Sequence, residues 1–271
     1  MWWWSQRRDR AVLGFTRRGH GGSTGRYRGC NLGAHVEDDP ATVTRNRTAV
    51  VDAVSSLAGV ESTRVTPVFM QQVHGASVRV IEDLSQVAPA GPGADPCDAV
   101  VTTLPHVALF SLVADCTPVL FTDAGAGVVA AAHAGRPGML AGIIPETVAA
   151  MRDLGAERIQ AVVGPSVCPR CYEVPETMRA QAMTVEPVSG SVTWTGTPAI
   201  DVAAGVVAQL RRDGIEVTWV PGCTRESDDL YSYRRDGPTG RFAGVVMRAP
   251  DLMGTDPDPT GPGAGARSAH E

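Results

Sequence analysis

The sequence predicts a mixed α/β or α+β fold built as a single domain. Runs typical of β-strands outnumber helical patterns by about two to one, and no break in composition separates the two kinds of segment. Apolar runs such as VVAAAH show no polar alternation, which indicates strands that are covered on both faces. With 271 residues, the chain is long enough to bury a substantial core without disulfide staples.

Helical signals occur in four segments. In the first, Asp39 precedes a proline at the first helical position, the apolar residues recur every three to four positions, and Gly59 closes the pattern. The other helices are predicted at 140–154 with Gly155 as the stop, at about 175–183, and at 201–212 between Asp201 as N-cap and Gly214.

Strand signals are short apolar runs bounded by turn residues. They occur at 11–16, 65–70, 77–81, 107–113, 118–122, 127–132, 158–163, 215–220 and 242–247. No internal repeat is visible among them. We therefore expect one domain over residues 11–249, with residues 1–10 as a flexible N-terminus. Residues 250–271 are rich in Pro, Gly and Asp and poor in apolar residues, so we expect a disordered tail there.

The charge pattern argues against nucleic acid as a partner. Lysine plus arginine total 24 against 29 aspartate plus glutamate, which gives a net charge of −5, and the basic residues are scattered. No apolar run approaches the ~18 residues of a membrane span. The first apolar stretch is also shorter than the ~7 to 15 residues of a signal-peptide core. We expect a cytoplasmic protein without membrane contacts, with its six cysteines reduced.

Three short stretches place a potential metal ligand at the end of an apolar run: His74 in QQVHG, Cys116 in ADCTP and His133 in AAHAG. Strand ends beside Gly or Pro are where α/β proteins present side chains to a cleft. Taken singly, Cys116 is best explained as a buried packing residue, and each histidine as a residue whose ring is hydrogen-bonded to a backbone carbonyl. Taken together, two histidines and one cysteine resemble a catalytic zinc site with an open fourth position.

The motif CPRC contains a second pair of thiols, Cys168 and Cys171. Such a pair can act in redox chemistry or form half of a structural zinc site. The chain has no second CxxC to complete four sulfurs, and no thioredoxin-like context surrounds this one. We interpret the motif as chance proximity in a proline-rich loop that shapes a pocket wall with Tyr172 and Glu173.

Arginines beside glycine-rich turns are suited to bidentate binding of phosphate. A solvated surface position is the alternative for any one of them. The candidates are Arg47 on the first predicted helix, Arg136 in HAGRPG, and Arg234, Arg235 and Arg241 in SYRRDGPTGR.

In combination, these segments resemble the laccase-domain family, whose members are also called polyphenol oxidases, purine nucleoside phosphorylases or peptidoglycan editing factors. The resemblance extends from about residue 11 to residue 248. It rests on the order and spacing of NLGAHVEDDP with TRNR, QQVHG, CDAVVTT, ADCTPVLF, AAHAG, GPSVCPRCYEV and YSYRRDGPTGR. The family usually reads HAGWRG where this chain reads HAGRPG, so Arg136 takes the tryptophan position and Pro137 the arginine position.

The resemblance implies a four-layer α/β/β/α sandwich with mixed sheets and a metal site at His74, Cys116 and His133. It also implies a zinc-dependent purine nucleoside phosphorylase that acts on adenosine, inosine or methylthioadenosine with phosphate. Adenosine deamination would be a side activity, in which a zinc-activated hydroxide attacks C6 of the purine. We expect a monomer or weak dimer.

The remaining site residues are chosen from the chemistry that phosphorolysis requires and from the arginine pattern. Glu173 is expected to act as the acid that protonates the leaving purine. Substrate binding is expected from Arg47, Gln72, Arg136, Arg234 and Arg241.

Three alternatives to the phosphorylase stay open. Two histidines and a cysteine are also the trigonal ligand set of a blue-copper site, so copper is possible and a copper-dependent phenol oxidase is one alternative. A multicopper centre needs more histidine-rich sites than a chain with six histidines offers, which favours zinc. Hydrolytic editing of peptidoglycan precursors is the second alternative. The third is a non-catalytic partner of the cell-envelope machinery whose metal is structural.

Overall fold

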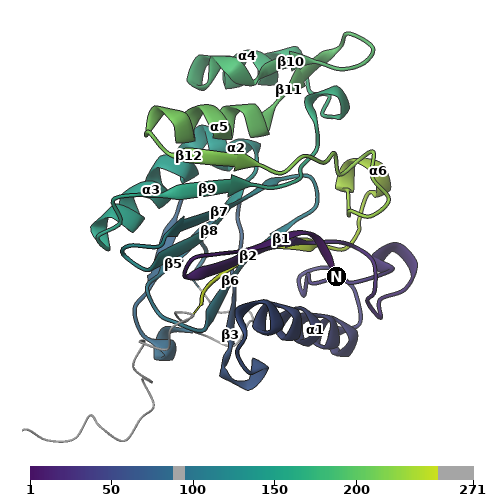
Figure 1. Cartoon of the computed structure of the whole chain (residues 1–271). Helices are drawn as coiled ribbons and strands as arrows, with labels where there is room; N and C mark the ends of the chain where they lie inside the picture. Colours follow the sequence, from purple (N-terminus) through teal and green to yellow (C-terminus); the bar gives the residue numbers. More distant parts are fainter. Residues whose placement is uncertain (88–94, 250–271) are drawn as a thin grey trace, which may run out of the picture.

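Two β-sheets lie face to face at the centre of the protein (Figure 1). The structure is a computed structural model of the chain, and it describes residues 1–87 and 95–249. The predicted tail at 250–271 lies outside the described residues. The first sheet has the order β1-β2-β13-β6-β3 and the second the order β12-β9-β7-β8-β5-β4. Both sheets are mixed, because β3 pairs in parallel with β6, β4 with β5, and β12 with β9.

The strands of these sheets are short, and most of their residues are buried. Their bounds are β1 Trp2–Arg8, β2 Ala11–Thr16, β3 Thr66–Phe69, β4 Val78–Ile81, β5 Ala99–Thr102, β6 Val107–Val113, β7 Thr117–Asp123, β8 Val128–Ala134, β9 Gln160–Val163, β12 Glu216–Trp219 and β13 Phe242–Arg248. A separate two-stranded sheet pairs β10 Gly190–Val192 with β11 Pro198–Ile200.

Helices cover the outer faces of both sheets (Figure 1). In the described part of the chain they are α1 Pro40–Ala58, α2 Arg136–Ala141, α3 Ile143–Asp153, α4 Glu176–Val185, α5 Val202–Arg212 and α6 Tyr233–Asp236. Helix α1 packs on the first sheet, whereas α2, α3 and α5 pack on the second, and α4 lies beyond α5 with the β10–β11 hairpin. No helix among residues 1–87 and 95–249 combines the length and the apolar character needed to cross a membrane.

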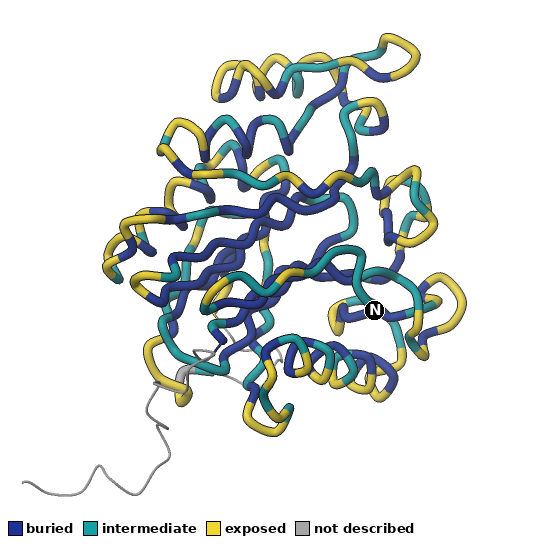
Figure 2. Tube along the Cα trace, viewed as in Figure 1, coloured by how far each residue is buried: buried dark blue, intermediate teal, exposed yellow. Residues whose placement is uncertain are grey.

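Three apolar cores separate the four layers, as expected for an α/β/β/α sandwich. Leu109 on β6 and Leu120 on β7 belong to the core between the sheets. Their chain neighbours point the opposite way, because successive side chains of a strand alternate between its faces. Phe110 faces α1, and Phe121 faces the helices of the second sheet. Figure 2 shows the result: central strands are buried throughout, with exposed residues on outer helices, on loops and on the edge strand β12.

Local signals explain where α1 begins and ends. The carboxylate of Asp39 accepts a hydrogen bond from the Thr42 N–H at 2.9 Å, and Gly59 takes the left-handed φ of 70° that closes the helix. The prediction of a single helix at 140–154 is wrong in where that helix begins. Gly142 has a φ of 92° and separates α2, which already begins at Arg136, from α3.

The prediction that residues 1–10 are a flexible N-terminus is wrong for most of that segment. Strand β1 pairs antiparallel with β2 at the edge of the first sheet. The indole of Trp2 covers Gly14, where an added Cβ would lie 2.7 Å from the ring, and Trp3 Nε1 donates a hydrogen bond to the Pro221 carbonyl at 3.2 Å. Strands β5, β10 and β11 were also not predicted.

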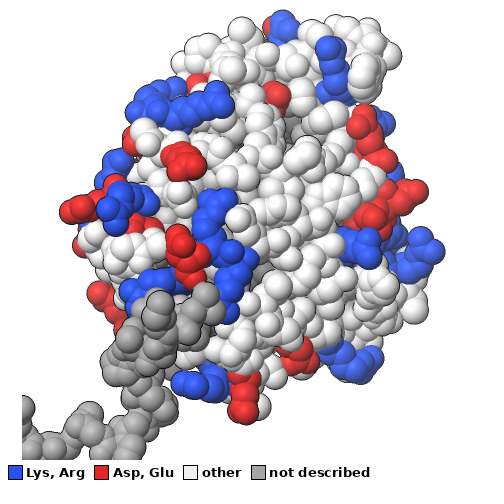
Figure 3. Space-filling view, viewed as in Figure 1, with Lys and Arg blue, Asp and Glu red and all other residues white. Residues whose placement is uncertain are grey.

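Charged groups of both signs are mixed on the face of the molecule shown in Figure 3, with a broad uncharged region between them. Several arginines are tied to carbonyl oxygens or to acidic side chains, for example Arg212 to Glu186 at 2.9 Å. The scattered charge of the sequence therefore corresponds to scattered charge on this face.

Candidate functional site

A cavity of about 870 Å³ opens at one end of the first sheet. The ends of β3 and β6 contribute part of its wall through Phe69 and Leu112. Helix α1 contributes Arg47, and the second sheet contributes His133 from β8. The cavity therefore lies where both sheets and the loops that leave them meet, a common position for ligand sites in layered α/β proteins.

His74, Cys116 and His133 come together in this cavity. One ligand atom from each residue lies within 4.8 Å of the others, and His74 Nε2 is 3.7 Å from Cys116 Sγ. The two imidazole rings meet edge to face with centroids 4.8 Å apart. His133 is buried on β8, whereas His74 is exposed in the loop after β3 and Cys116 is half-buried in the turn before β7. The three residues thus form one donor set, although 42 positions separate His74 from Cys116 and 17 separate Cys116 from His133.

Asp98, which sequence reasoning missed, organises two of these three residues. It is fully buried and accepts hydrogen bonds from the backbone N–H groups of Val73, His74 and Gly75 at 3.2, 2.9 and 2.7 Å. Its Oδ1 also lies 2.8 Å from His133 Nδ1. An ionised carboxylate can only accept, so Nδ1 donates a proton to it, and Nε2 is the ring nitrogen left to bind a metal once it has released its own proton.

The charge state of Asp98 follows from these contacts. Burial alone raises the pKa of a carboxyl, but the hydrogen bonds from His133 and from the backbone outweigh burial here and lower the pKa of Asp98. The residue precedes the buried strand β5 in the segment CDAVVTT. An aspartate directly before an all-apolar run is the signal that could have pointed to it.

The surroundings of Cys116 favour its thiolate form. Burial raises the pKa of the thiol, but His133 and His74 outweigh it and bring the pKa well below the usual value. Burial likewise lowers the pKa of His133, whereas Cys116 and Asp98 raise it more strongly. Since the thiolate is the form of cysteine that binds metal ions, the site is electrostatically prepared for a cation.

The turn that carries Cys116 is held by Asp115, a residue that sequence reasoning also missed. Asp115 has a φ of 95°, which is unusual for a residue other than glycine. Its carboxylate accepts hydrogen bonds from Thr224 Oγ1 at 2.6 Å, Ser232 Oγ at 2.7 Å and the Arg234 N–H at 2.7 Å. These contacts attach the Cys116 turn to the segment 224–234 that forms another wall of the cavity.

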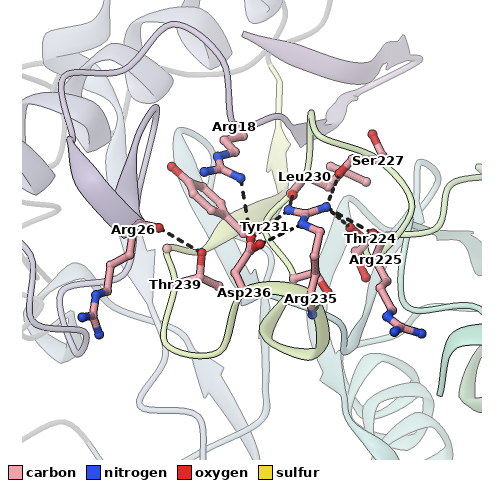
Figure 4. A network of polar contacts seen from close by, with 12 residues as sticks. Arg18, Arg26, Thr224, Arg225, Ser227, Leu230, Tyr231, Arg235, Asp236 and Thr239 are labelled. Carbon is pink, nitrogen blue, oxygen red and sulfur yellow. Dashed lines mark hydrogen bonds and ion pairs between the residues drawn. The ribbon is translucent and has the colours of Figure 1, made fainter. Parts of the chain in front are cut away.

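That segment has its own internal clamp, shown in Figure 4. Arg235 Nη1 donates to the carbonyls of Thr224, Arg225 and Ser227 at 3.0, 3.3 and 2.7 Å, and Nη2 donates to the Leu230 carbonyl at 2.8 Å. The same guanidinium pairs with Asp236 on the adjacent residue. Arg235 is therefore a structural residue of the loop, and its neighbour Arg234 is the one that reaches the cavity.

One wall of the cavity is cationic. Arg47 Nε donates to the Leu32 carbonyl at 2.9 Å, and its guanidinium carbon lies 3.7 Å from the centre of the Phe69 ring. No carboxylate in the described ranges lies within 4 Å of Arg47, and burial lowers its pKa to about 10. Arg241 also lines the cavity, and its partial burial lowers its pKa.

His35, a third residue of this wall, was missed by sequence reasoning although it lies in the segment NLGAHVEDDP. Burial lowers the pKa of its ring, and the positive charges of Arg241 and Arg47 lower it further. The ring is therefore poor at carrying a proton until an anion enters. A histidine in a loop two residues after Gly33 is the kind of signal that could have identified it.

Arg234 and Tyr172 line the opposite part of the cavity. The Arg234 guanidinium lies 4.5 Å from the centre of the Tyr172 ring, and Nη1 donates to the Glu173 carbonyl at 3.1 Å. The side chain of Glu173 is exposed and is not part of the cavity lining, so the expectation that Glu173 supplies a proton there does not agree with the structure.

The structure places the other two predicted substrate-binding residues, Gln72 and Arg136, differently. Gln72 lines the cavity, but its amide is bonded at both ends to the backbone of Leu112: Nε2 donates to the carbonyl at 2.7 Å and Oε1 accepts from the N–H at 2.8 Å. It therefore pins the His74 loop to β6. Arg136 begins α2 and is not among the cavity-lining residues.

Fold and site together define an α/β/β/α protein whose cavity combines a donor set of two histidines and one cysteine with a cationic wall. The chain belongs to the family described as "Multi-copper polyphenol oxidoreductase laccase", whose family model matches residues 12–249.

Relatives of this chain carry an enzyme name. It is 53% identical over 240 residues to a Streptomyces coelicolor protein named purine nucleoside phosphorylase SCO2081, covering 87% of this chain and 95% of that one. It is 44% identical over 236 residues to the Corynebacterium glutamicum purine nucleoside phosphorylase Cgl2154/cg2365, covering 86% and 92% of the two chains.

Solved structures share the fold. The Neisseria meningitidis protein NMB0706, described with the family name DUF152, superposes with a TM-score of 0.74 at 30% identity, covering 89% of this chain and 95% of that one. YlmD from Geobacillus stearothermophilus superposes with a TM-score of 0.77 at 28% identity, covering 89% and 93%. The expected family and the expected sandwich are both confirmed.

Proposed function

We propose that this protein is a zinc-dependent purine nucleoside phosphorylase that cleaves adenosine, inosine or methylthioadenosine with phosphate and deaminates adenosine as a side activity. One observation carries the proposal: a single cavity juxtaposes the donor set His74, Cys116 and His133 with the cationic groups Arg47 and Arg241. The names of the relatives at 53% and 44% identity support the same reaction class.

The donor set fits zinc. Two ligands of a tetrahedral zinc, with a Zn–N distance of ~2.1 Å and a Zn–S distance of ~2.3 Å, lie about 3.6 Å apart. The observed separation of His74 Nε2 and Cys116 Sγ is 3.7 Å. His74, Cys116 and His133 would hold the zinc. A zinc ion held by three protein ligands would supply Lewis acidity and could bring the pKa of a coordinated water near ~7.

The cationic wall is suited to phosphate. Arg47 is fixed by its bond to the Leu32 carbonyl and by the Phe69 ring, yet its two terminal nitrogens have no protein partner in the described ranges. A doubly charged phosphate against Arg47 and Arg241 would gain charge-assisted hydrogen bonds in a partly desolvated site. It would also favour protonation of His35, whose pKa is held down by these same arginines.

The chain's own residues then account for the steps of phosphorolysis. Phosphate held by Arg47 attacks C1′ of the ribose, the C1′–N9 bond breaks, and its electron pair leaves with the purine. The purine ring would lie against the apolar part of the cavity near Tyr172. It takes up one proton as it leaves. Glu173 is exposed and is not part of the cavity lining, so the candidate proton donors outside the metal donor set include Tyr172, Tyr233 and His35.

The number of metal-binding side chains argues against the copper-oxidase alternative. In residues 1–87 and 95–249 the cluster in the cavity contains two histidines and one cysteine, a set for a single metal ion. A multicopper oxidase requires additional histidine-rich copper sites beside such a centre. The donor set therefore supports one zinc rather than a multinuclear copper centre.

A direct assay tests the proposal. Purified protein loaded with zinc is incubated with adenosine or inosine, with and without phosphate, and the products are separated by chromatography. We expect free base and ribose 1-phosphate only when phosphate is present, and slow formation of inosine from adenosine in either case. Zinc-loaded, folded protein that makes no ribose 1-phosphate from any of the three nucleosides would refute the proposed reaction.

A further inference from the structure

A second cluster of potential metal ligands lies outside the catalytic cavity. It consists of Cys168, Cys171, Cys223 and Glu226, and one ligand atom from each lies within 4.8 Å of the others. The sequence interpretation of CPRC as an isolated pair is therefore incomplete, because two partners arrive from a distant loop. Their separation of 52 residues or more hid them from any local spacing rule.

The two loops that carry these residues follow neighbouring parallel strands. Cys168 and Cys171 lie in the turn after β9, and Cys223 lies in the loop after β12. Because β9 and β12 pair in parallel, their carboxyl ends meet at the same edge of the second sheet. The pairing continues as an isolated bridge between Ser166 and Cys223, which brings the second loop against the first.

The local geometry resembles that of a thiolate metal site. The Cys171 N–H donates to the Cys168 carbonyl at 2.9 Å, which closes the CPRC turn and places both sulfurs on one side. The Cys168 N–H points at Cys223 Sγ over 3.4 Å, and Cys171 Sγ lies 3.4 Å from Glu226 Oε1. Backbone N–H groups that donate to a sulfur stabilise its anionic form.

The four groups need a cation if they are to be charged together. Burial raises the pKa of Cys171 and of Cys168, and the neighbouring Cys223 raises both further. No arginine in the described ranges forms an ion pair with Glu226. A divalent metal would compensate three thiolates and one carboxylate at once.

We propose that Cys168, Cys171, Cys223 and Glu226 bind a second zinc ion, separate from the one assigned to the cavity. Three thiolates and one carboxylate complete a tetrahedral shell, which is the closed arrangement of a structural zinc site. On binding, three thiols release three protons and no electrons are transferred. The charge of the site becomes −2, from four negative ligands and one dication. This site does not depend on the proposed phosphorylase activity.

The second zinc would stiffen one wall of the catalytic cavity. Tyr172 directly follows Cys171 and lines the cavity, and Thr224 directly follows Cys223 and donates to Asp115 at 2.6 Å. A metal that joins the two loops therefore fixes a lining residue and the support of the Cys116 turn together. The Arg235 clamp in Figure 4 already closes the second loop around Glu226, so little ordering remains for the metal to impose.

Metal counting on the full chain tests this site. Zinc-loaded protein, freed of excess metal, is analysed by native mass spectrometry and elemental analysis. We expect two zinc ions per chain in the parent, one in Cys168→Ala/Cys223→Ala, and one in His74→Ala/Cys116→Ala. Cys30→Ala is the matched control, since Cys30 is a fully buried cysteine of the core beside α1, and this variant should keep two.

A second measurement covers the case in which the double cysteine variant fails to fold. In the parent protein, alkylation mapped by mass spectrometry should spare Cys168, Cys171 and Cys223 with zinc bound and label them after chelation. Two results would overturn the site: one zinc per parent chain that persists in Cys168→Ala/Cys223→Ala, or labelling of the three thiols that is unchanged by zinc. A disulfide within the cluster in freshly purified parent, seen as a mass lower by two hydrogens, would also overturn it.

Discussion

Asp98 and His133 are joined twice. The backbone N–H of His133 donates to the Asp98 carbonyl at 2.7 Å, and its ring Nδ1 lies 2.8 Å from the Asp98 carboxylate. The first contact belongs to the edge where β5 meets β8, and the second sets the orientation of the imidazole. The geometry of the proposed metal ligand is therefore coupled to the register of two strands, so the fold itself prepares the site.

Replacing Asp98 by Asn should weaken zinc binding. The amide offers one acceptor oxygen where the carboxylate offers two, and its nitrogen would face the N–H groups that now donate to Asp98. Loss of such an outer contact typically lowers metal affinity ~10- to 100-fold. Competition with a chromogenic chelator measures this directly.

Asp123→Asn is the control for that experiment. Asp123 is also buried and accepts hydrogen bonds from three backbone N–H groups, those of Ala126, Glu157 and Arg158. It should lower stability without changing zinc affinity. If both variants bind zinc as the parent does, the role assigned to Asp98 is wrong.

Gly135→Ala should disturb the metal site without removing any ligand. A Cβ at this position would lie 2.7 Å from His74 Cδ2 and 3.1 Å from Cys116 Sγ, while the backbone φ of −74° suits alanine. The displaced side chains should lower zinc affinity at least roughly tenfold. Gly19→Ala, where the nearest atom is 3.9 Å away, should leave binding unchanged. Equal zinc affinity in the two variants would contradict the crowding argument.

Arg47→Ala should separate the two proposed activities. Loss of one charge-assisted contact with phosphate costs ~1.5 to 3 kcal/mol, so we expect phosphate-dependent cleavage to fall roughly ten- to hundredfold. Deamination of adenosine needs no phosphate and should change much less. Arg136→Ala serves as the comparison, because Arg136 lies outside the cavity lining and should behave like the parent. An equal loss of both activities in Arg47→Ala, with zinc retained, would remove Arg47 from the phosphate site.

Stability should decline at alkaline pH partly through Cys30. Burial raises the pKa of this thiol from 9.0 to about 11. Between these pH values the Cys30 thiol is therefore largely ionised in the unfolded chain but largely neutral in the folded protein. The contribution is complete below pH 9 and is lost as the pH rises toward 11. At pH 10 the loss of stability from this thiol amounts to about 1.4 kcal/mol. Denaturant unfolding of Cys30→Ala should show a correspondingly smaller decrease between pH 8 and 10; parallel curves for parent and variant would exclude this cause.

Much of the fold could be predicted because its signals are local. Asp39, Pro40 and Gly59 define α1 through contacts within a few residues, and the all-apolar runs of β6 to β8 report burial on both faces. The break at Gly142 could not be predicted, because a glycine within a helical pattern is usually tolerated. Strand β1 was missed because Trp2 is stabilised by Gly14, a contact that only the folded sheet creates.

The candidate site was predictable to the extent that each residue type carries its own chemistry. His74, Cys116 and His133 stand out as potential ligands at strand ends, and the structure brings them together. Asp98 and Asp115 act through hydrogen bonds to partners distant in sequence, so no spacing rule reveals them. The same holds for Cys223 and Glu226, whose relation to CPRC depends on the parallel pairing of β9 with β12.

The position of β13 has a consequence for synthesis of the protein on the ribosome. This strand occupies the middle of the first sheet, between β2 and β6, although it is the last strand of the described chain. Until residues 242–248 have emerged, β2 and β6 each expose an unpaired edge, and their apolar faces lack a central partner. Nascent chains and products truncated before Phe242 should therefore depend on chaperones to avoid edge-to-edge aggregation.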